Sequence, residues 1–180
     1  NVRRTGIWAI KLLKGDFLRQ AIKVKTGDEV IIITKKGKAI RFREKQIRSM
    51  GRLAAGVKGI KLAKEDEVVA VQRIEKVKLK ELQILILTAN GFGKKVKIRD
   101  FRIQSRGGSG IKAARLTKKT GEIIFAKVLE KDEEELLVIS QKGQLIKIKL
   151  ASIPVLSRMA QGVKIMRLKA CDQVASAVCI

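Results

Sequence analysis

The sequence has no histidine and no tyrosine, and it has only one proline, two cysteines and 3% aromatic residues. Without His or Tyr, the chain cannot build a histidine acid/base site, a Ser-His-Asp triad or a tyrosyl nucleophile. Cys171 and Cys179 lack both C-x-x-C spacing and accompanying histidines, so a zinc site is not expected. We therefore expect reduced thiols, no catalytic residue in this chain, no metal and no cofactor.

Long apolar runs are also missing. No stretch approaches the roughly 18 apolar residues of a membrane span, and the N-terminus lacks the basic-then-apolar pattern of a signal peptide. We expect an intracellular protein without a membrane partner. The chain starts at Asn1 and not at Met, so we also expect a piece of a longer protein.

Positive charge is abundant. The chain has 41 Lys and Arg residues against 17 Asp and Glu, a net charge of +24, while 46% of its residues are hydrophobic. The apolar content is sufficient for a folded core. A compact domain with this charge is expected to bind a polyanion.

Two motifs recur along the chain. An apolar strand that runs into a glycine turn occurs at 29–37, 82–91 and 135–143. A heptapeptide recurs with starts 50, 54 and 52 residues apart, at Gly6–Leu12, Gly56–Leu62, Gly110–Leu116 and Gly162–Leu168. The repeats define modules at about 6–55, 56–109 and 110–161 and a partial module at 162–180.

Each module has the pattern of four short strands separated by turns. In the second module we expect strands at about 56–62, 67–75, 82–89 and 92–98 and very little helix. The continuously apolar segments Val68–Val71 and Ile84–Leu87 are expected to be buried on both faces. The sequence thus predicts an all-β fold of four-stranded antiparallel blades that are arranged radially.

Basic residues recur in register with the fourth strand of each module. At four and six residues after the turn glycine, the outward positions are expected to be Arg41, Arg43, Lys95, Lys97, Lys147 and Lys149. One interpretation is the solvated face of a half-buried strand, which needs polar residues of any kind. The other is a set of DNA phosphate contacts.

Arginine also recurs four residues before each of the last three heptapeptide glycines, at Arg52, Arg106 and Arg158. The surrounding Gly, Ala and Ser residues would let a phosphate approach the backbone amides while the guanidinium binds it. The alternative is a tight connection between blades, in which the small residues only serve the turn.

The few aromatic residues bear on the kind of polyanion. Proteins that bind single strands stack bases on exposed rings, whereas a double helix can be held through its phosphates alone. We therefore expect duplex DNA, bound with little base reading and bent or wrapped along a basic rim. Two alternatives stay open, a protein that binds structured RNA and a repeat that docks an acidic protein.

The chain resembles the C-terminal domain of the DNA gyrase A protein over its whole length. The resemblance rests on Gly56–Leu62 together with Thr88–Lys95, and on 37–42, 47–51 and 161–164. It implies a β-pinwheel whose blades exchange strands and whose basic rim wraps duplex DNA in support of negative supercoiling. This chain is similar to the second half of that domain, with about three and a half blades.

The resemblance also bears on sites and partners. The family's hallmark heptapeptide is expected in an earlier blade, and we interpret Gln104, Arg106, Gly107, Gly108 and Gly110 as a degenerate copy. The family's cleavage tyrosine lies in another domain and its ATPase in another subunit, so this chain would be a non-catalytic part of a topoisomerase. The resemblance implies two protein partners, the gyrase B subunit and a second gyrase A protein. It also implies that the protein is cytoplasmic and associated with the nucleoid. The corresponding domain of topoisomerase IV is the alternative.

Overall fold

The computed structural model describes residues 5–75, 79, 81–130 and 132–180, and these form β-strands joined by turns. The helical residues described are confined to three 3-10 turns, η1 (Glu44–Gln46), η3 (Ile98–Asp100) and η4 (Leu150–Ser152), which confirms the expected scarcity of helix. The strands are β1 (Glu29–Thr34), β2 (Lys38–Arg43), β3 (Val68–Ile74), β4 (Gln83–Thr88), β5 (Phe92–Lys97), β6 (Ile111–Lys112), β7 (Ile123–Val128), β8 (Glu135–Ser140), β9 (Leu145–Lys149), β10 (Val163–Lys164) and β11 (Val174–Cys179).

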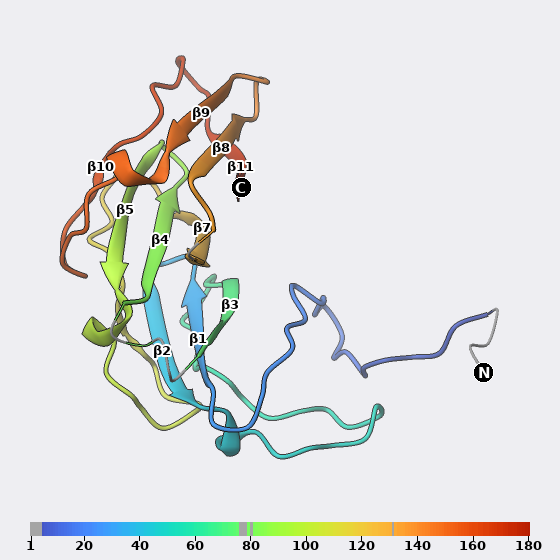
Figure 1. The fold of residues 1–180 in the computed structure, drawn as a ribbon. Coiled ribbons are helices and arrows are strands. Elements are labelled where there is room, and N and C mark those ends of the chain that lie inside the picture. Colours follow the sequence, from blue (N-terminus) through green and yellow to red (C-terminus); the bar gives the residue numbers. More distant parts are fainter. Residues whose placement is uncertain (1–4, 76–78, 80, 131) are drawn as a thin grey trace.

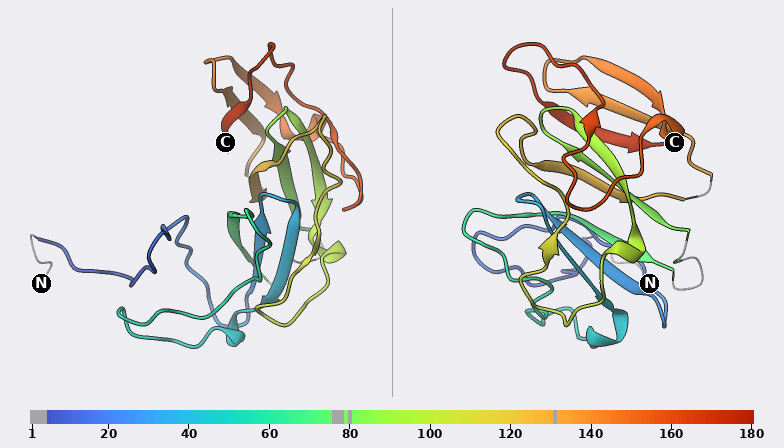
Figure 2. Two further views of the ribbon diagram at one scale, coloured as in Figure 1. Left: turned by 180° about the vertical axis from the view of Figure 1, so that it is seen from behind. Right: turned by 90° about the vertical axis from the view of Figure 1, so that its left-hand side faces the viewer.

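The strands form three antiparallel sheets, which we call the first, second and third blade. Their strand orders are β3-β1-β2-β6, β7-β4-β5-β10 and β11-β8-β9. The blades follow one another along a curved path (Figures 1 and 2). Strands β3, β7 and β11 contact one another from blade to blade and form the inner edge, while β6 and β10 form the outer edge. The predicted fold class is confirmed.

The blades exchange strands along the sequence. The hairpin β1–β2 takes its inner strand β3 from the next repeat and its outer strand β6 from the repeat after that. In this pairing Lys38 lies opposite Lys112, and in the second blade Phe92 lies opposite Lys164. Each heptapeptide that joins a sheet therefore completes the hairpin that lies two repeats before it.

Strand β4 is buried on both faces, as its continuous apolar sequence predicts. Ile84 and Ile86 pack in the core between the first and second blades, and Leu85 and Leu87 pack between the second and third blades. All four are at most 1% exposed. The expectation for Val68–Val71 is only partly met, because among these four residues of the inner strand only Ala70 is buried.

The strand expected at 56–62 is not formed, although Ile60 is buried in the core on the outer face of the first blade. The described chain holds no hairpin two repeats before this heptapeptide. Its backbone therefore has no sheet edge to pair with, and it contacts the loop 104–108 instead, with Lys61 N–H donating to the Gly108 carbonyl at 2.9 Å.

The segment before β1 leaves the blades. Residues 5–18 project away from the body (Figure 1), and Trp8 is 82% exposed. The segment returns through Gln20, whose side chain accepts a hydrogen bond from Val71 N–H at 3.1 Å, and through Ile22, which packs against the first blade. Among the described residues, no helix has the length and apolar character needed to cross a membrane.

Candidate nucleic-acid interface

Arg41 was expected to point outward, and that expectation is wrong. Its side chain is 4% exposed and forms an ion pair with Glu29, with Nε at 2.6 Å from the carboxylate. It also donates to the carbonyls of Ile98 and Phe101, at 3.2 and 2.8 Å. The second blade packs over this face of β2, so Arg41 connects two blades and is not accessible to a phosphate.

Lys95 occupies the same place in the second blade and is also not an open surface position. It is half-buried, and its ammonium donates to the Leu150 carbonyl at 2.9 Å. Burial lowers the pKa of Lys95 below its ordinary value. At this register position the first and second blades therefore bind the 3-10 turn of the next blade, η3 through Arg41 and η4 through Lys95.

The other predicted positions on these strands are exposed. Arg43 and Lys97 stand at the ends of β2 and β5, where the neighbouring blade no longer covers the strand. Lys147 and Lys149 alternate with half-buried residues along β9, as predicted, and Lys147 forms an ion pair with Glu135 at 2.6 Å. These four side chains remain candidates for phosphate contact.

The loop arginines share one contact. Each donates from its guanidinium to the carbonyl of the third residue in the preceding heptapeptide. Arg52 donates to Trp8 at 3.2 Å, Arg106 to Lys58 at 2.5 Å and Arg158 to Lys112 at 2.6 Å. Each contact lies within one module and holds the loop that leads to the next heptapeptide against the preceding one, which fits the alternative interpretation. The remaining N–H groups of these arginines leave phosphate contact as a prediction.

The segment interpreted as a degenerate box lies in the loop that carries Arg106 and ends at Gly110, directly before β6. Gln104 N–H donates to the Arg41 carbonyl at 2.7 Å, and Gly107 N–H donates to the Gly59 carbonyl at 2.8 Å. Gly110 has φ +69°, and a Cβ there would lie 2.5 Å from the Ala39 carbonyl oxygen. Gly110 is thus needed for β6 to approach β2. The box contributes internal contacts, with Arg106 half-buried and Gly108 exposed.

The structure identifies a further basic set that was missed as a candidate site. In each of the last three heptapeptides the third and sixth residues are basic and exposed, and they lie on the outer edge or in the segment beside it. We call them the basic edge: Lys58, Lys61, Lys112, Arg115, Lys164 and Arg167. The signal was present in the repeat itself, because Lys or Arg recurs at both positions.

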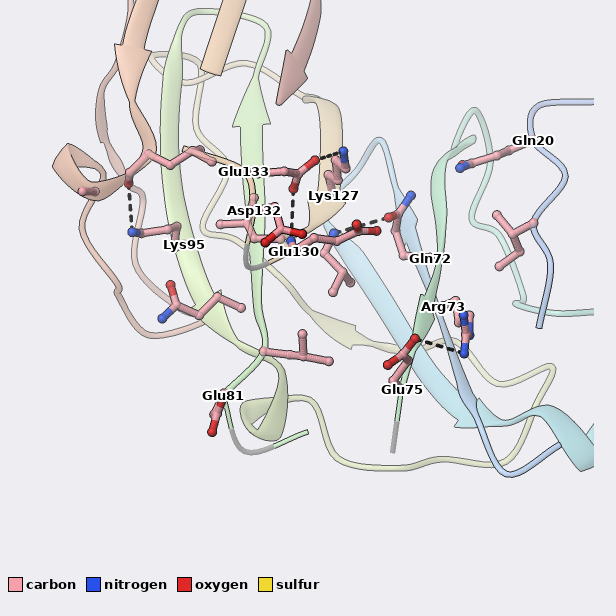
Figure 3. A pocket seen from close by; sticks show the side chains of 17 residues that line it. Gln20, Gln72, Arg73, Glu75, Glu81, Lys95, Lys127, Glu130, Asp132 and Glu133 are labelled. Atoms are coloured by element: carbon pink, nitrogen blue, oxygen red, sulfur yellow. Dashed lines mark hydrogen bonds and ion pairs between the residues drawn. The ribbon is translucent and has the colours of Figure 1, made fainter. Parts of the chain in front are cut away.

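The inner side has the opposite character. A cavity of about 810 Å³ lies beside the inner strands β3 and β7 and is lined by five carboxylate residues and three cationic ones (Figure 3). Arg73 pairs with Asp28 at 2.5 Å, and Lys127 pairs with Glu133. In a chain of net charge +24, an acidic lining would repel a polyanion. The inner cavity and the basic edge are therefore electrostatically distinct.

Comparisons with known proteins agree with this architecture. The family model for the DNA gyrase C-terminal domain, a beta-propeller, matches residues 28–75, 83–130 and 134–180. The DNA gyrase A protein of Staphylococcus aureus (strain MRSA252) is 37% identical over 93% of this chain, which spans only 18% of that relative's length.

Two solved structures are similar in three dimensions. A DNA gyrase A C-terminal domain superposes with a TM-score of 0.84 at 27% identity, covering 98% of this chain and 58% of that one. The C-terminal domain of a DNA topoisomerase IV gives a TM-score of 0.78 at 26% identity, covering 86% and 47%. On the sequence match and the shared blade architecture, this chain belongs to the DNA gyrase C-terminal domain family.

Proposed function

We propose that this chain binds duplex DNA through its phosphates along the outer edge of the blades and bends it around them. The observation that carries the proposal is the basic edge, in which two exposed cations recur in each of three successive heptapeptides. A duplex presents regularly spaced phosphates, and contacts to them need no particular base sequence. A repeated cationic edge therefore suits any DNA sequence.

The curvature of the blades supports bending. Bending a duplex costs free energy, which contacts spread over successive blades can offset. The outer edge lies on the convex side of the stack, and the loop residues Arg106 and Arg158 lie against two of the heptapeptides that carry the basic edge. In this proposal the chain is the DNA-wrapping part of a type IIA topoisomerase that supports negative supercoiling, together with the gyrase B protein and a second gyrase A protein.

Binding can be tested by the salt dependence of affinity for a fluorescent duplex. If the six residues of the basic edge each neutralise one phosphate, the slope of log K against log salt is expected to be about −5. Two duplexes of unrelated sequence are expected to bind within about tenfold of each other. A salt-independent affinity, or tighter binding to an RNA hairpin, would overturn the proposal.

A matched pair of variants locates the contacts. The edge variant replaces Lys112, Arg115 and Arg167 by Gln, and it is expected to make the slope about 3 units shallower. The control variant removes the same charge from the exposed segment before β1, by replacing Lys14, Lys23 and Lys25. Equal losses in the two variants would show that only net charge matters and that the basic edge is not the site.

Wrapping needs a separate measurement. A closed circular plasmid is relaxed by an independent topoisomerase in the presence of saturating chain, and the linking-number shift is read after protein removal. Since this chain resembles about half of the wrapping domain, we expect a smaller shift per bound molecule than an intact domain causes. No shift despite saturated binding would mean that the chain binds without bending.

A further inference from the structure

The ammonium group of Lys94 lies beneath the loop that carries Arg158. Lys94 belongs to β5 and is 1% exposed. Its Nζ donates to the carbonyls of Ser157, Arg158 and Ala160, at 2.9, 2.7 and 2.9 Å. An ammonium has three donors, so each finds a partner, and the three carbonyls are directed toward the interior.

This arrangement directs backbone N–H groups of the loop away from Lys94. In a trans peptide the C=O and the following N–H point in opposite directions. The amides of Arg158, Met159 and Gln161 follow the three carbonyls that Lys94 binds, so they point away from it. Within the described part of the chain, nothing accepts a hydrogen bond from these three amides. The loop 157–161 therefore presents a group of free N–H donors.

The charges around the loop are positive. Arg158 donates to the Lys112 carbonyl at 2.6 Å, and Arg115 N–H reaches the Ala160 carbonyl at 3.4 Å, so two members of the basic edge flank the loop. The Lys94 ammonium is held by neutral carbonyls. Successive outward amides among uncompensated cations form a concavity that attracts anions.

The corresponding loop of the preceding repeat differs in the residue beneath it and in the partners of its amides. Ile40 occupies the position of Lys94 beneath it, three residues after the turn glycine. There, Arg106 N–H donates to the Gln46 side chain at 2.7 Å and Gly107 N–H to the Gly59 carbonyl at 2.8 Å. The two amides that correspond to those of Arg158 and Met159 are therefore satisfied within the chain, so these free amides accompany the buried lysine and are not a general property of the loop.

We infer that the loop 157–161 is a binding site for one backbone phosphate of duplex DNA, and that Lys94 is the positioning residue that holds the loop amides outward. The phosphate accepts hydrogen bonds from the amides and from the Arg158 guanidinium, beside Lys112 and Arg115. This inference rests on the proposed function and assigns it a specific phosphate site.

The buried charge makes the site sensitive to pH. Burial, and to a lesser degree the charge of Arg158, lowers the pKa of Lys94 to about 8. A bound phosphate favours the charged ammonium, so binding above pH 8 takes up a proton and affinity falls as pH rises from 7 to 9. The charged groups that face the loop and Lys94 are Arg158, Arg115 and Lys112.

The first test compares Lys94→Met with Lys142→Met by fluorescence anisotropy on one duplex. Lys142 is an exposed lysine whose ammonium donates to only one carbonyl, that of Ala170, at 2.9 Å. Its replacement therefore controls for the loss of one charge. We expect Lys94→Met to weaken binding about tenfold at pH 7, to make the salt slope about 0.9 shallower and to lose the wild-type fall toward pH 9. Equal effects of the two variants, or an unchanged pH dependence in Lys94→Met, would overturn the inference.

The second test needs no variant and stands even if Lys94→Met fails to fold. The wild-type amide resonances of Arg158, Met159 and Gln161 are followed by NMR during titration with a short duplex and, separately, with inorganic phosphate. They are expected to shift with the duplex more than those of Arg106 and Gly107. Unshifted loop amides at saturating DNA overturn the site alone, whereas a wild type that does not bind DNA overturns the proposed function. If inorganic phosphate saturates the loop amides at a lower phosphate concentration than the duplex does, the loop is a site for a small anion and the inference is overturned.

Discussion

Arg41 and Glu29 form a buried ion pair within the first hairpin, with side chains 4% and 5% exposed. The same guanidinium donates to two carbonyls at the η3 turn of the second blade, so it stabilises both the hairpin and the contact between blades. Arg43, two residues further along β2, is exposed. Two arginines on the same face of one strand thus have different roles.

Replacing Arg41 by Gln is expected to lower the free energy of unfolding by about 3–5 kcal/mol, because it leaves the Glu29 carboxylate buried without its partner. Arg43→Gln is expected to change it by no more than about 0.5 kcal/mol and to weaken DNA binding instead. Urea denaturation and duplex binding measure the two effects. An Arg41→Gln protein of normal stability with reduced DNA affinity would restore Arg41 as a surface contact.

Gly110 and Gly143 provide a test of the close approach of β6 to β2. Both have positive φ, +69° and +80°, but a Cβ on Gly110 would lie 2.5 Å from the Ala39 carbonyl oxygen, whereas nothing lies within 4 Å of one on Gly143. Alanine at Gly143 is expected to cost about 1–2 kcal/mol from backbone strain. Alanine at Gly110 is expected to cost about 1–3 kcal/mol more because β6 must move away. Equal thermal shifts in the two variants would contradict this account.

Asp66 joins the first hairpin turn to the following repeat. Its carboxylate accepts hydrogen bonds from Thr34 Oγ1 at 2.8 Å and from the N–H groups of Lys36 and Glu67 at 2.9 Å. Asp66→Ala is expected to lower the free energy of unfolding by about 1–3 kcal/mol, because these donors lose their acceptor. Asp132→Ala, an exposed control, is expected to stay within about 0.5 kcal/mol in the same denaturation experiment. A loss at Asp132 as large as that at Asp66 would contradict the assignment.

The two thiols are expected to differ in reactivity. Both cysteines are free, but Cys171 is exposed and Cys179 is buried. Burial, together with the nearby Glu133 carboxylate, raises the pKa of Cys179 to about 11. At pH 8 a thiol reagent is expected to modify Cys171 rapidly in the folded chain and both residues in denaturant. Rapid modification of two thiols in the native chain would show that β11 opens from the third blade.

The sequence by itself determined the repeat, the strands and the hairpins, because these depend on local order. The turn glycines and the apolar runs between them mark β1, β2, β4, β5, β8 and β9, and the continuous apolar run of β4 requires burial on both faces. The positive charge and the scarcity of aromatic residues likewise follow from composition, as does the expectation of a polyanionic partner.

Only the tertiary structure decided which basic side chains are accessible. Arg41 and Lys95 follow turn glycines in the same way as the exposed Lys147 of β9, yet they are buried or half-buried because the next blade packs over β2 and β5 and supplies carbonyls to them. The heptapeptides likewise reach the outer edge only by pairing with a hairpin two repeats away. A local pattern cannot specify such a partner, since the contact depends on how successive blades stack and exchange strands.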